Sequence, residues 1–189
     1  TRPDVLIALL TTVMGASAMF ALYTYVAPVL TLLTGASQGF ITLALVLIGL
    51  GFTFGNWLGG RVADWSLEGA TAIFLAALSA VSLAAPLTLG TPIGAGITLF
   101  LWGTAAFAIV PPVQMRVMRA AAGAPGLASS INVGAFNLGN AIGAALGGAA
   151  ISAGLGYAAV PVVGGLTAAT GLGLVWLGKQ RKAALACEA

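Results

Sequence analysis

Six long apolar stretches follow one another along the chain, and short segments rich in glycine, proline or charge separate them. A helix that crosses a membrane needs about 20 mostly apolar residues, and each stretch provides them. They predict membrane spans at residues 5–28, 40–58, 70–89, 94–113, 130–153 and 158–177. Residues typical of turns separate several of the spans, at 34–37, 90–92, 123–126 and 154–156.

Apolar residues occupy both the even and the odd positions of each stretch, whereas apolar and polar residues alternate in the strands of a membrane barrel. Of the 189 residues, 60% are hydrophobic and 6% are charged, while a soluble domain carries about 25% charged residues. The chain therefore lacks the polar surface of a soluble globule. We expect an all-α integral membrane protein in which residues 1–189 form a single bundle of six transmembrane helices.

The charged residues lie on one side of the predicted spans. They precede the first span or follow the second, fourth and sixth, and the segments after the first, third and fifth spans carry none. They are Arg2, Asp4, Arg61, Asp64, Glu68, Arg116, Arg119, Lys179, Arg181, Lys182 and Glu188. The positive-inside rule makes this side cytoplasmic, so both termini of the segment are expected there. Since no span contains a charge, residues that couple transport to protons are expected outside this segment.

A short phrase occurs twice, 84 residues apart. Residues 52–59 read Phe-Thr-Phe-Gly-Asn-Trp-Leu-Gly, and residues 136–143 read Phe-Asn-Leu-Gly-Asn-Ala-Ile-Gly. At the same offset Tyr23 corresponds to Phe107, and Pro28 corresponds to Pro112. Many transporters consist of weakly similar repeats with inverted topology, and their substrate sites lie between the repeats. The phrase therefore predicts two inverted three-helix repeats.

Small residues recur at four-residue spacing in the second and fifth spans. Residues four apart share a helix face, so each span presents a smooth stripe that another backbone can approach closely. The glycines of these stripes are Gly51, Gly55, Gly59, Gly139, Gly143 and Gly147. Two interpretations remain open, namely static helix packing and a surface that rocks against a partner during transport.

Aromatic and amide side chains near the prolines are candidates for a substrate cavity. Proline bends or ends a helix, and aromatic side chains beside such bends suit a pocket for an amphipathic or aromatic molecule. The candidates are Phe20, Tyr23, Trp102, Phe107, Gln114, Asn132, Phe136 and Asn137. The aromatic residues also fit interfacial anchoring, and the amides also fit hydrogen bonds between helices.

After the second span the chain reads Gly-Gly-Arg-Val-Ala-Asp and reaches Asp64. This segment resembles the cytoplasmic loop motif of the major facilitator superfamily, of the form G-x-L-A-D-R-x-G-R-K. Gly60, Ala63 and Asp64 match the motif, and Val62 replaces its leucine. Trp65 stands where arginine is usual, and the later glycine and basic pair are missing. The second half of such transporters carries a degenerate copy of this kind.

Two longer runs extend the resemblance over nearly the whole chain. Residues 101–116 contain Leu-Trp-Gly, a phenylalanine, Pro-Pro-Val-Gln and an arginine, and residues 128–140 read Ala-Ser-Ser-Ile-Asn-Val-Gly-Ala-Phe-Asn-Leu-Gly-Asn. Both runs are similar to the arabinose-efflux-permease branch of the drug–proton antiporters. The resemblance implies that the segment is the C-terminal half of a twelve-helix transporter in the bacterial inner membrane.

By that resemblance, the first and fourth spans line the central cavity and the second and fifth meet the N-terminal half. The third and sixth spans face lipid. The resemblance also implies that Asp64 latches the cytoplasmic side in the outward-open state, with Arg61 or Arg116 as its partner. The residues assigned to this loop motif are Gly60, Arg61, Asp64 and Arg116.

The expected function is secondary active transport, as proton-coupled efflux of a small drug-like or sugar-like molecule by alternating access. The alternative is a non-transporting six-span subunit or a channel assembled through the glycine stripes. An aquaporin is excluded because no Asn-Pro-Ala tripeptide occurs, and a serine–histidine hydrolase is excluded because the chain has no histidine. We expect no metal, no cofactor and no nucleic-acid partner. Because the chain begins Thr-Arg-Pro-Asp, we expect it to be part of a longer protein.

Overall fold

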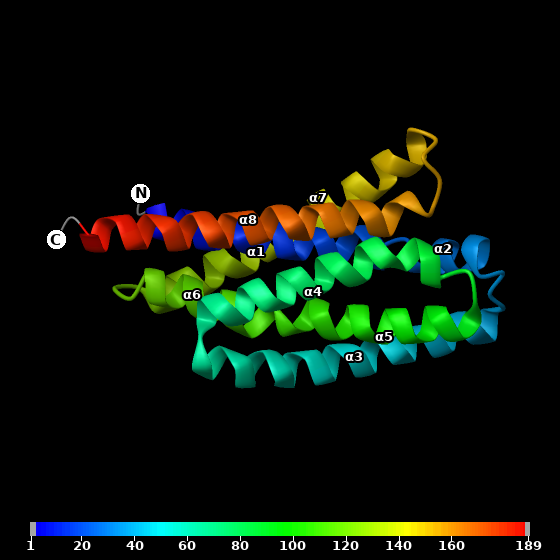
Figure 1. Cartoon of the computed structure of the whole chain (residues 1–189), viewed down its shortest axis with the longest axis horizontal. Coiled ribbons are helices and arrows are strands. Elements are labelled where there is room, and N and C mark those ends of the chain that lie inside the picture. The colour runs from blue at the N-terminus through cyan, green and yellow to red at the C-terminus, as the bar shows by residue number, and fades with distance from the viewer. Residues whose placement is uncertain (1–2, 188–189) are drawn as a thin grey trace.

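The computed structural model describes residues 3–187, which form helices and no strand in that range (Figure 1). Arg2 and Glu188, two of the charges that the sequence places on the cytoplasmic side, lie outside the described residues. The helices are α1 (Pro3–Tyr23), α2 (Val26–Leu33), α3 (Gln38–Trp65), α4 (Leu67–Thr88), α5 (Pro92–Ala108), α6 (Val110–Ala120), α7 (Pro125–Ser152) and α8 (Ala159–Cys187).

Five segments among the described residues are long and apolar enough to cross a membrane. They are Pro3–Tyr23, Gln38–Trp65, Leu67–Thr88, Pro92–Ala120 and Ala159–Arg181. The fifth predicted span, residues 130–153, falls in α7, which has 28 residues and is therefore about 42 Å long at 1.5 Å per residue. Its three asparagines and its many glycines make it less apolar than the other five. The segment is long enough to span a membrane, but its composition alone does not mark it as a span.

Prolines divide the first and fourth predicted spans at equivalent places. Proline offers no N–H to the carbonyl four residues earlier, and its ring collides with that carbonyl. Pro28 thus interrupts the helix at Thr24 and Tyr25, between α1 and α2, and Pro112 interrupts it at Ile109, between α5 and α6. The two interruptions are 84 residues apart, which is the offset of the repeated phrase.

Short polar caps and glycines make the turns. The side chains of Ser37, Ser66 and Thr91 accept hydrogen bonds from backbone N–H groups in the first turns of α3, α4 and α5. Such caps satisfy donors that the first helical turn leaves unpaired. Gly35 and Gly154 have φ angles of 65° and 78°, which glycine adopts without steric cost.

Four helix pairs have the most extensive contacts, namely α3 with α5, α1 with α7, α4 with α8, and α1 with α8. The first repeat would contain α1, α3 and α4, and the second α5–α6, α7 and α8. Exchanging the repeats turns the α1–α7 pair into the α5–α3 pair and leaves α4–α8 unchanged. The packing therefore has the pattern that two inverted three-helix repeats require.

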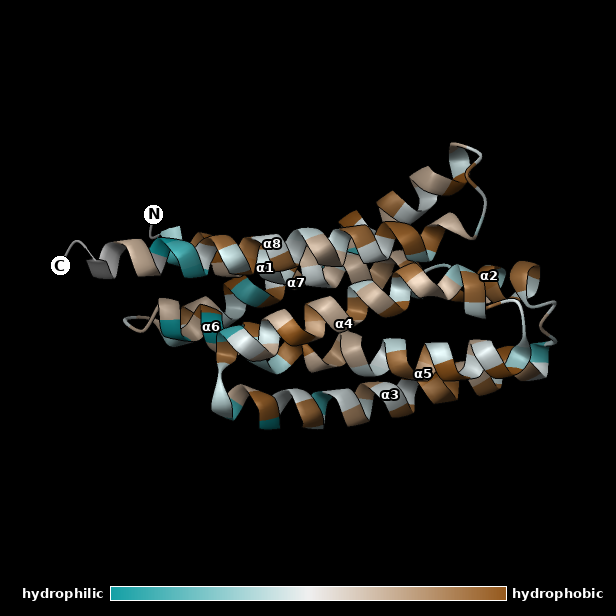
Figure 2. Cartoon of the chain, viewed as in Figure 1, coloured by the Kyte–Doolittle hydropathy of each residue, from teal (hydrophilic) through white to brown (hydrophobic). Residues whose placement is uncertain are grey.

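The polar residues gather at one end of the bundle. Figure 1 shows the N- and C-terminal ends there, together with the α3–α4 and α6–α7 connections, while the α2–α3, α4–α5 and α7–α8 connections lie at the opposite end. Figure 2 shows the hydrophilic residues of α6 and of the C-terminal part of α8 at this same end. The charges are thus on one side of the apolar bundle, as the sequence predicted.

Candidate functional site

The glycines of α3 lie directly against the backbone of α5. A methyl group added to any of the three would collide with a carbonyl oxygen of α5, so only glycine allows this approach. The contacts are Gly51 with Phe100, Gly55 with Thr104, and Gly59 with Ala108. The carbonyl of Ala108 is also the one that loses its helical donor to Pro112.

The glycines of α7 contact α1 in the same manner. The contacts to carbonyl oxygens are Gly139 with Val13, Gly143 with Ser17, and Gly147 with Ala21. The Ser17 hydroxyl also donates a hydrogen bond to the carbonyl of Gly139 over 3.0 Å. Both stripes therefore join helices within this chain.

Six aromatic side chains form a continuous row across α7, α1, α3 and α5, which we call the aromatic row. Four members follow one another in space as Phe136, Phe20, Tyr23 and Phe52, and Phe52 contacts both remaining members, Phe107 and Trp102. Neighbouring ring centroids along α7, α1 and α3 lie 5.6 to 6.4 Å apart, within the range of favourable aromatic contacts. Neither α4 nor α8 contributes to the row.

The row leads from the outside of the bundle to its interior. The ring of Tyr23 is 39% exposed, whereas Trp102 is fully buried. Phe52 lies between them, with its centroid 3.9 Å from that of Phe107 in a stacked arrangement and 6.2 Å from that of Trp102. The indole Nε1 of Trp102 is buried and has no hydrogen-bond partner among the described residues. The row thus combines the faces and edges of differently oriented aromatic rings with a buried, unpaired donor at its inner end.

A chain of hydrogen bonds connects α1, α7 and α6. Thr12 Oγ1 donates to Asn132 Oδ1 at 2.8 Å, and Asn132 Nδ2 donates to Gln114 Oε1 at 2.5 Å. Gln114 Nε2 in turn donates to Ser129 Oγ at 2.7 Å. Asn132 is buried, and a buried amide is stable only when it is hydrogen-bonded. Asn132 and Gln114 therefore bond between helices, and Asn137 is exposed.

Comparison with known proteins identifies the family. No family model matches the chain. It is 55% identical over 188 residues to the inner membrane transport protein YdhP of Escherichia coli (strain K12). These residues cover 100% of this chain and 48% of that protein. It is 34% identical over 145 residues to the uncharacterized MFS-type transporter YfhI of Bacillus subtilis (strain 168), with 77% of this chain and 36% of that protein covered. The chain belongs to the major facilitator superfamily.

A third relative is a chloramphenicol resistance protein of Streptomyces lividans. It is 33% identical over 145 residues, which cover 75% of this chain and 36% of that protein. The chain spans about half the length of the curated relatives it matches. YdhP and YfhI are named as transporters.

The superfamily loop motif does not lie in a loop. Gly60, Arg61 and Asp64 belong to the last turns of α3, which continues to Trp65. The helix extends beyond the predicted span, and of the Gly-Gly pair only Gly59 packs closely on α5. Only Ser66 separates α3 from α4.

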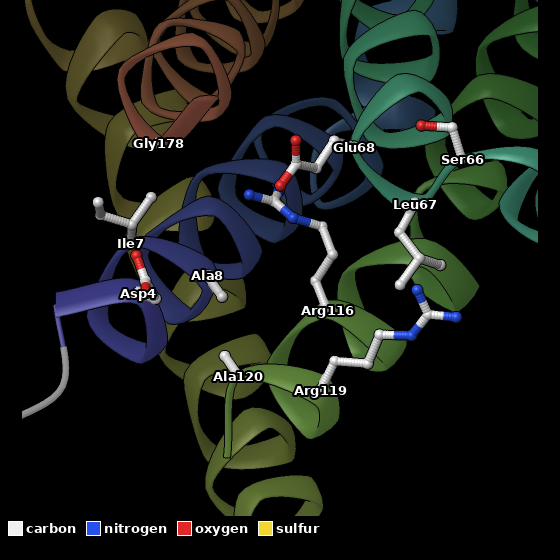
Figure 3. A pocket seen from close by; sticks show the side chains of 10 residues that line it. All are labelled: Asp4, Ile7, Ala8, Ser66, Leu67, Glu68, Arg116, Arg119, Ala120 and Gly178. Carbon is white, nitrogen blue, oxygen red and sulfur yellow. The ribbon is translucent and has the colours of Figure 1, made fainter. Parts of the chain in front are cut away.

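The charged residues near this motif have different neighbours. Asp64 is exposed, and no ion pair joins it to Arg61 or Arg116 in the described part of the chain. The guanidinium of Arg61 lies 5.2 Å from the ring centroid of Trp57, a cation–π contact. Arg116 extends from α6 toward Glu68 of α4 (Figure 3).

Three residues that take part in these arrangements were not predicted from the sequence. Phe52 joins the two halves of the aromatic row. Its position in the repeated phrase, where it corresponds to Phe136, was the available signal. Thr12 and Ser129 complete the hydrogen-bonded chain. Their small hydroxyl side chains carried no signal, since such residues are common in membrane helices.

Proposed function

We propose that this chain is the C-terminal six-helix half of a twelve-helix transporter of the bacterial inner membrane. The half-length coverage of its relatives and the collection of charges at one end of the bundle support this proposal. The positive-inside rule assigns that end to the cytoplasm. Its partners are the lipid bilayer, the N-terminal half of the same protein and a small-molecule substrate.

The transporter exports small molecules with an aromatic or amphipathic face. The observation that carries this proposal is the aromatic row, which crosses four helices and combines exposed and buried rings. Planar rings bind apolar ligands by stacking and by edge contacts. The name of the chloramphenicol resistance relative is consistent with export. The runs at 101–116 and 128–140 resemble the drug-exporting branch of the superfamily, which is consistent with this assignment.

Alternating access requires each half to move as a rigid unit. The glycine contacts support this step, because they join α3 to α5 and α1 to α7 without intervening side chains. The row then keeps its shape while the half rocks. Asp64 acts as the cytoplasmic latch in the outward-open state, pairing with Arg61 or Arg116 when those side chains leave their present neighbours.

Proton coupling depends on the other half. The acidic residues of this chain are Asp4, Asp64, Glu68 and Glu188, and none lies within the six spans predicted from the sequence. A proton can shift the inward–outward equilibrium only by binding the two states differently. A carboxylate in the N-terminal half is therefore the coupling group.

The test is transport by the full-length protein that contains this chain, reconstituted in liposomes with radiolabelled chloramphenicol as the probe. An imposed pH gradient is expected to drive accumulation of the probe, and a protonophore is expected to abolish it. Accumulation of the probe that does not depend on the pH gradient would rule out proton coupling. Rapid flux of the probe only down its own concentration gradient would identify a channel. No flux of chloramphenicol or of other aromatic antibiotics would rule out the export proposal.

A further inference from the structure

One polar side chain beside the aromatic row has no hydrogen-bond partner. Asn140 of α7 is half-buried, and its side-chain Oδ1 atom is buried and accepts no hydrogen bond from the described residues. A buried polar atom without a hydrogen bond costs free energy, and native proteins leave few of them. The Asn140 oxygen is thus free to accept a hydrogen bond from a bound molecule.

Asn140 lies at the α7 end of the row. It follows Phe136 by four residues, and residues four apart share a helix face. Phe136 is in edge contact with Phe20 of α1, with ring centroids 6.4 Å apart. Gly139 and Gly143, before and after Asn140, rest against the backbone of α1. The amide therefore lies beside the α1–α7 contact, about 6 Å along the helix from the start of the row.

The repeated phrase places an equivalent amide on α3. Asn56 follows Phe52 by four residues, as Asn140 follows Phe136. The two amides differ in their surroundings, because Asn56 is exposed whereas the Asn140 oxygen is buried. The buried acceptor is therefore a feature of the second repeat, and Asn56 provides a natural comparison for it.

We propose that Asn140 determines specificity by accepting a hydrogen bond from a hydroxyl group of the exported molecule. This inference rests on the proposed export of aromatic molecules, and it narrows their class to neutral arenes that carry a hydroxyl. The ring packs in the aromatic row, and the hydroxyl lies about one helical turn, or 6 Å, from the ring. None of the acidic residues lies within the six spans predicted from the sequence, so this half offers a cationic donor no carboxylate at that depth.

The unpaired oxygen explains how two molecules of the same shape are told apart. A molecule with the hydroxyl pairs the Asn140 oxygen when it binds, whereas an analogue without the hydroxyl leaves that oxygen unpaired in a site closed to water. A site that hydrogen-bonds a hydroxyl rejects the analogue that lacks it. For one hydrogen bond between neutral groups, we expect a preference of about tenfold.

The experiment is displacement of radiolabelled chloramphenicol from the purified full-length protein that contains this chain. The competitors are thiamphenicol and florfenicol, which share one aromatic ring and differ only in a terminal hydroxyl that florfenicol replaces with fluorine. Fluorine donates no hydrogen bond, so this pair isolates the donor. We expect thiamphenicol to displace the label at a concentration about tenfold lower than florfenicol.

Two variants and a matched control test the acceptor itself. Asn140→Leu and Asn140→Ala should reduce the preference for thiamphenicol to about twofold or less, because neither side chain accepts a hydrogen bond. Asn56→Leu makes the same change at the equivalent but exposed position of the first repeat and should keep the tenfold preference. In the ligand-free protein Asn140→Leu should not lower the melting temperature, since it removes a buried atom that has no partner to lose.

Four results would overturn the proposal. They are equal displacement by the two competitors, a preference that both Asn140 variants retain, the same loss of preference in Asn56→Leu, and a lower melting temperature in both Asn140 variants. The last result would show that the amide is already paired within the full-length protein. An absence of specific chloramphenicol binding to the unmodified protein is distinguishable from these results, because it would overturn the proposed function on which this inference rests.

Discussion

Phe52 of α3 stacks on Phe107 of α5, with ring centroids 3.9 Å apart and an interplanar angle of 23°. Phe52 belongs to the first copy of the repeated phrase, and Phe107 corresponds by offset to Tyr23 of the first repeat. The stack therefore joins the two inverted repeats at the point where the aromatic row passes from the outside of the bundle to its interior. Three predictions concern the proposed transport site and its support, and a fourth concerns the cytoplasmic latch.

Phe52→Leu should reduce chloramphenicol transport by the full-length protein about threefold to tenfold. The variant keeps an apolar side chain but removes a stacked partner, and aromatic pairs contribute about 0.5–1.5 kcal/mol beyond their buried area. The measurement is the initial rate of gradient-driven uptake in liposomes at equal protein content. Phe54→Leu is the matched control, because Phe54 lies on the same helix but contacts Trp57 and Phe100 outside the row. Equal losses in the two variants would contradict a specific role for the row.

Gly143→Leu should destabilise the protein strongly, because Gly143 rests against the Ser17 carbonyl and α7 must separate from α1 to admit a side chain. Overpacking costs about 1–3 kcal/mol where neighbours adjust, and a backbone neighbour adjusts least. The melting temperature of the purified full-length protein should fall, together with its abundance in the membrane. Gly134→Leu is the control on the same helix, since its added Cβ meets nothing within 4 Å. A normal melting temperature for Gly143→Leu would contradict the close α1–α7 contact.

Asn132→Leu should cost about 1–3 kcal/mol of stability, because it removes the donor to the Gln114 side-chain Oε1 and leaves the Thr12 hydroxyl only its bond to the Ala8 carbonyl. Thermal unfolding of the full-length protein in detergent measures this effect. Asn137→Leu makes the same chemical change at an exposed position of α7 and should unfold nearly like the unmodified protein. If the two variants have equal melting temperatures, the hydrogen-bonded chain does not stabilise the bundle.

Asp64→Asn should slow export while leaving the amount of protein in the membrane nearly unchanged. Asp64 is exposed, so its neutralisation removes a charge without disturbing the core. Export assays and membrane immunoblots on the same cells separate the two effects. Asp64→Glu keeps the charge and should retain most of the activity. Export by Asp64→Asn at the unmodified rate would show that the latch assignment is wrong.

The sequence predicted the helical class, the positions of most helices and the internal repeat. These features depend on local chemistry, because a long apolar run must satisfy its own backbone hydrogen bonds inside a membrane. The proline positions likewise predicted a helix bend or end, which the structure locates at Tyr25 and Ile109. The α7 segment was predicted as a span from its length, although its asparagines and glycines make it less apolar than the five qualifying segments.

The candidate site was predicted only in part. The five aromatic candidates lie in one row. Phe52 also belongs to this row because it contacts side chains of α1 and α5, and no local sequence pattern predicts these contacts. Asn132 and Gln114 could be selected as polar residues in apolar surroundings. Whether they faced a cavity or each other depended on how α6 and α7 pack.

By itself, the sequence determined the apolar spans, the one-sided distribution of charge and the four-residue spacing of the glycines. Each follows from covalent neighbours and helix periodicity. Only the tertiary structure decided that Gly55 meets Thr104 while Gly143 meets Ser17. A glycine stripe specifies that some backbone comes close, but the identity of that backbone depends on the simultaneous packing of all the helices.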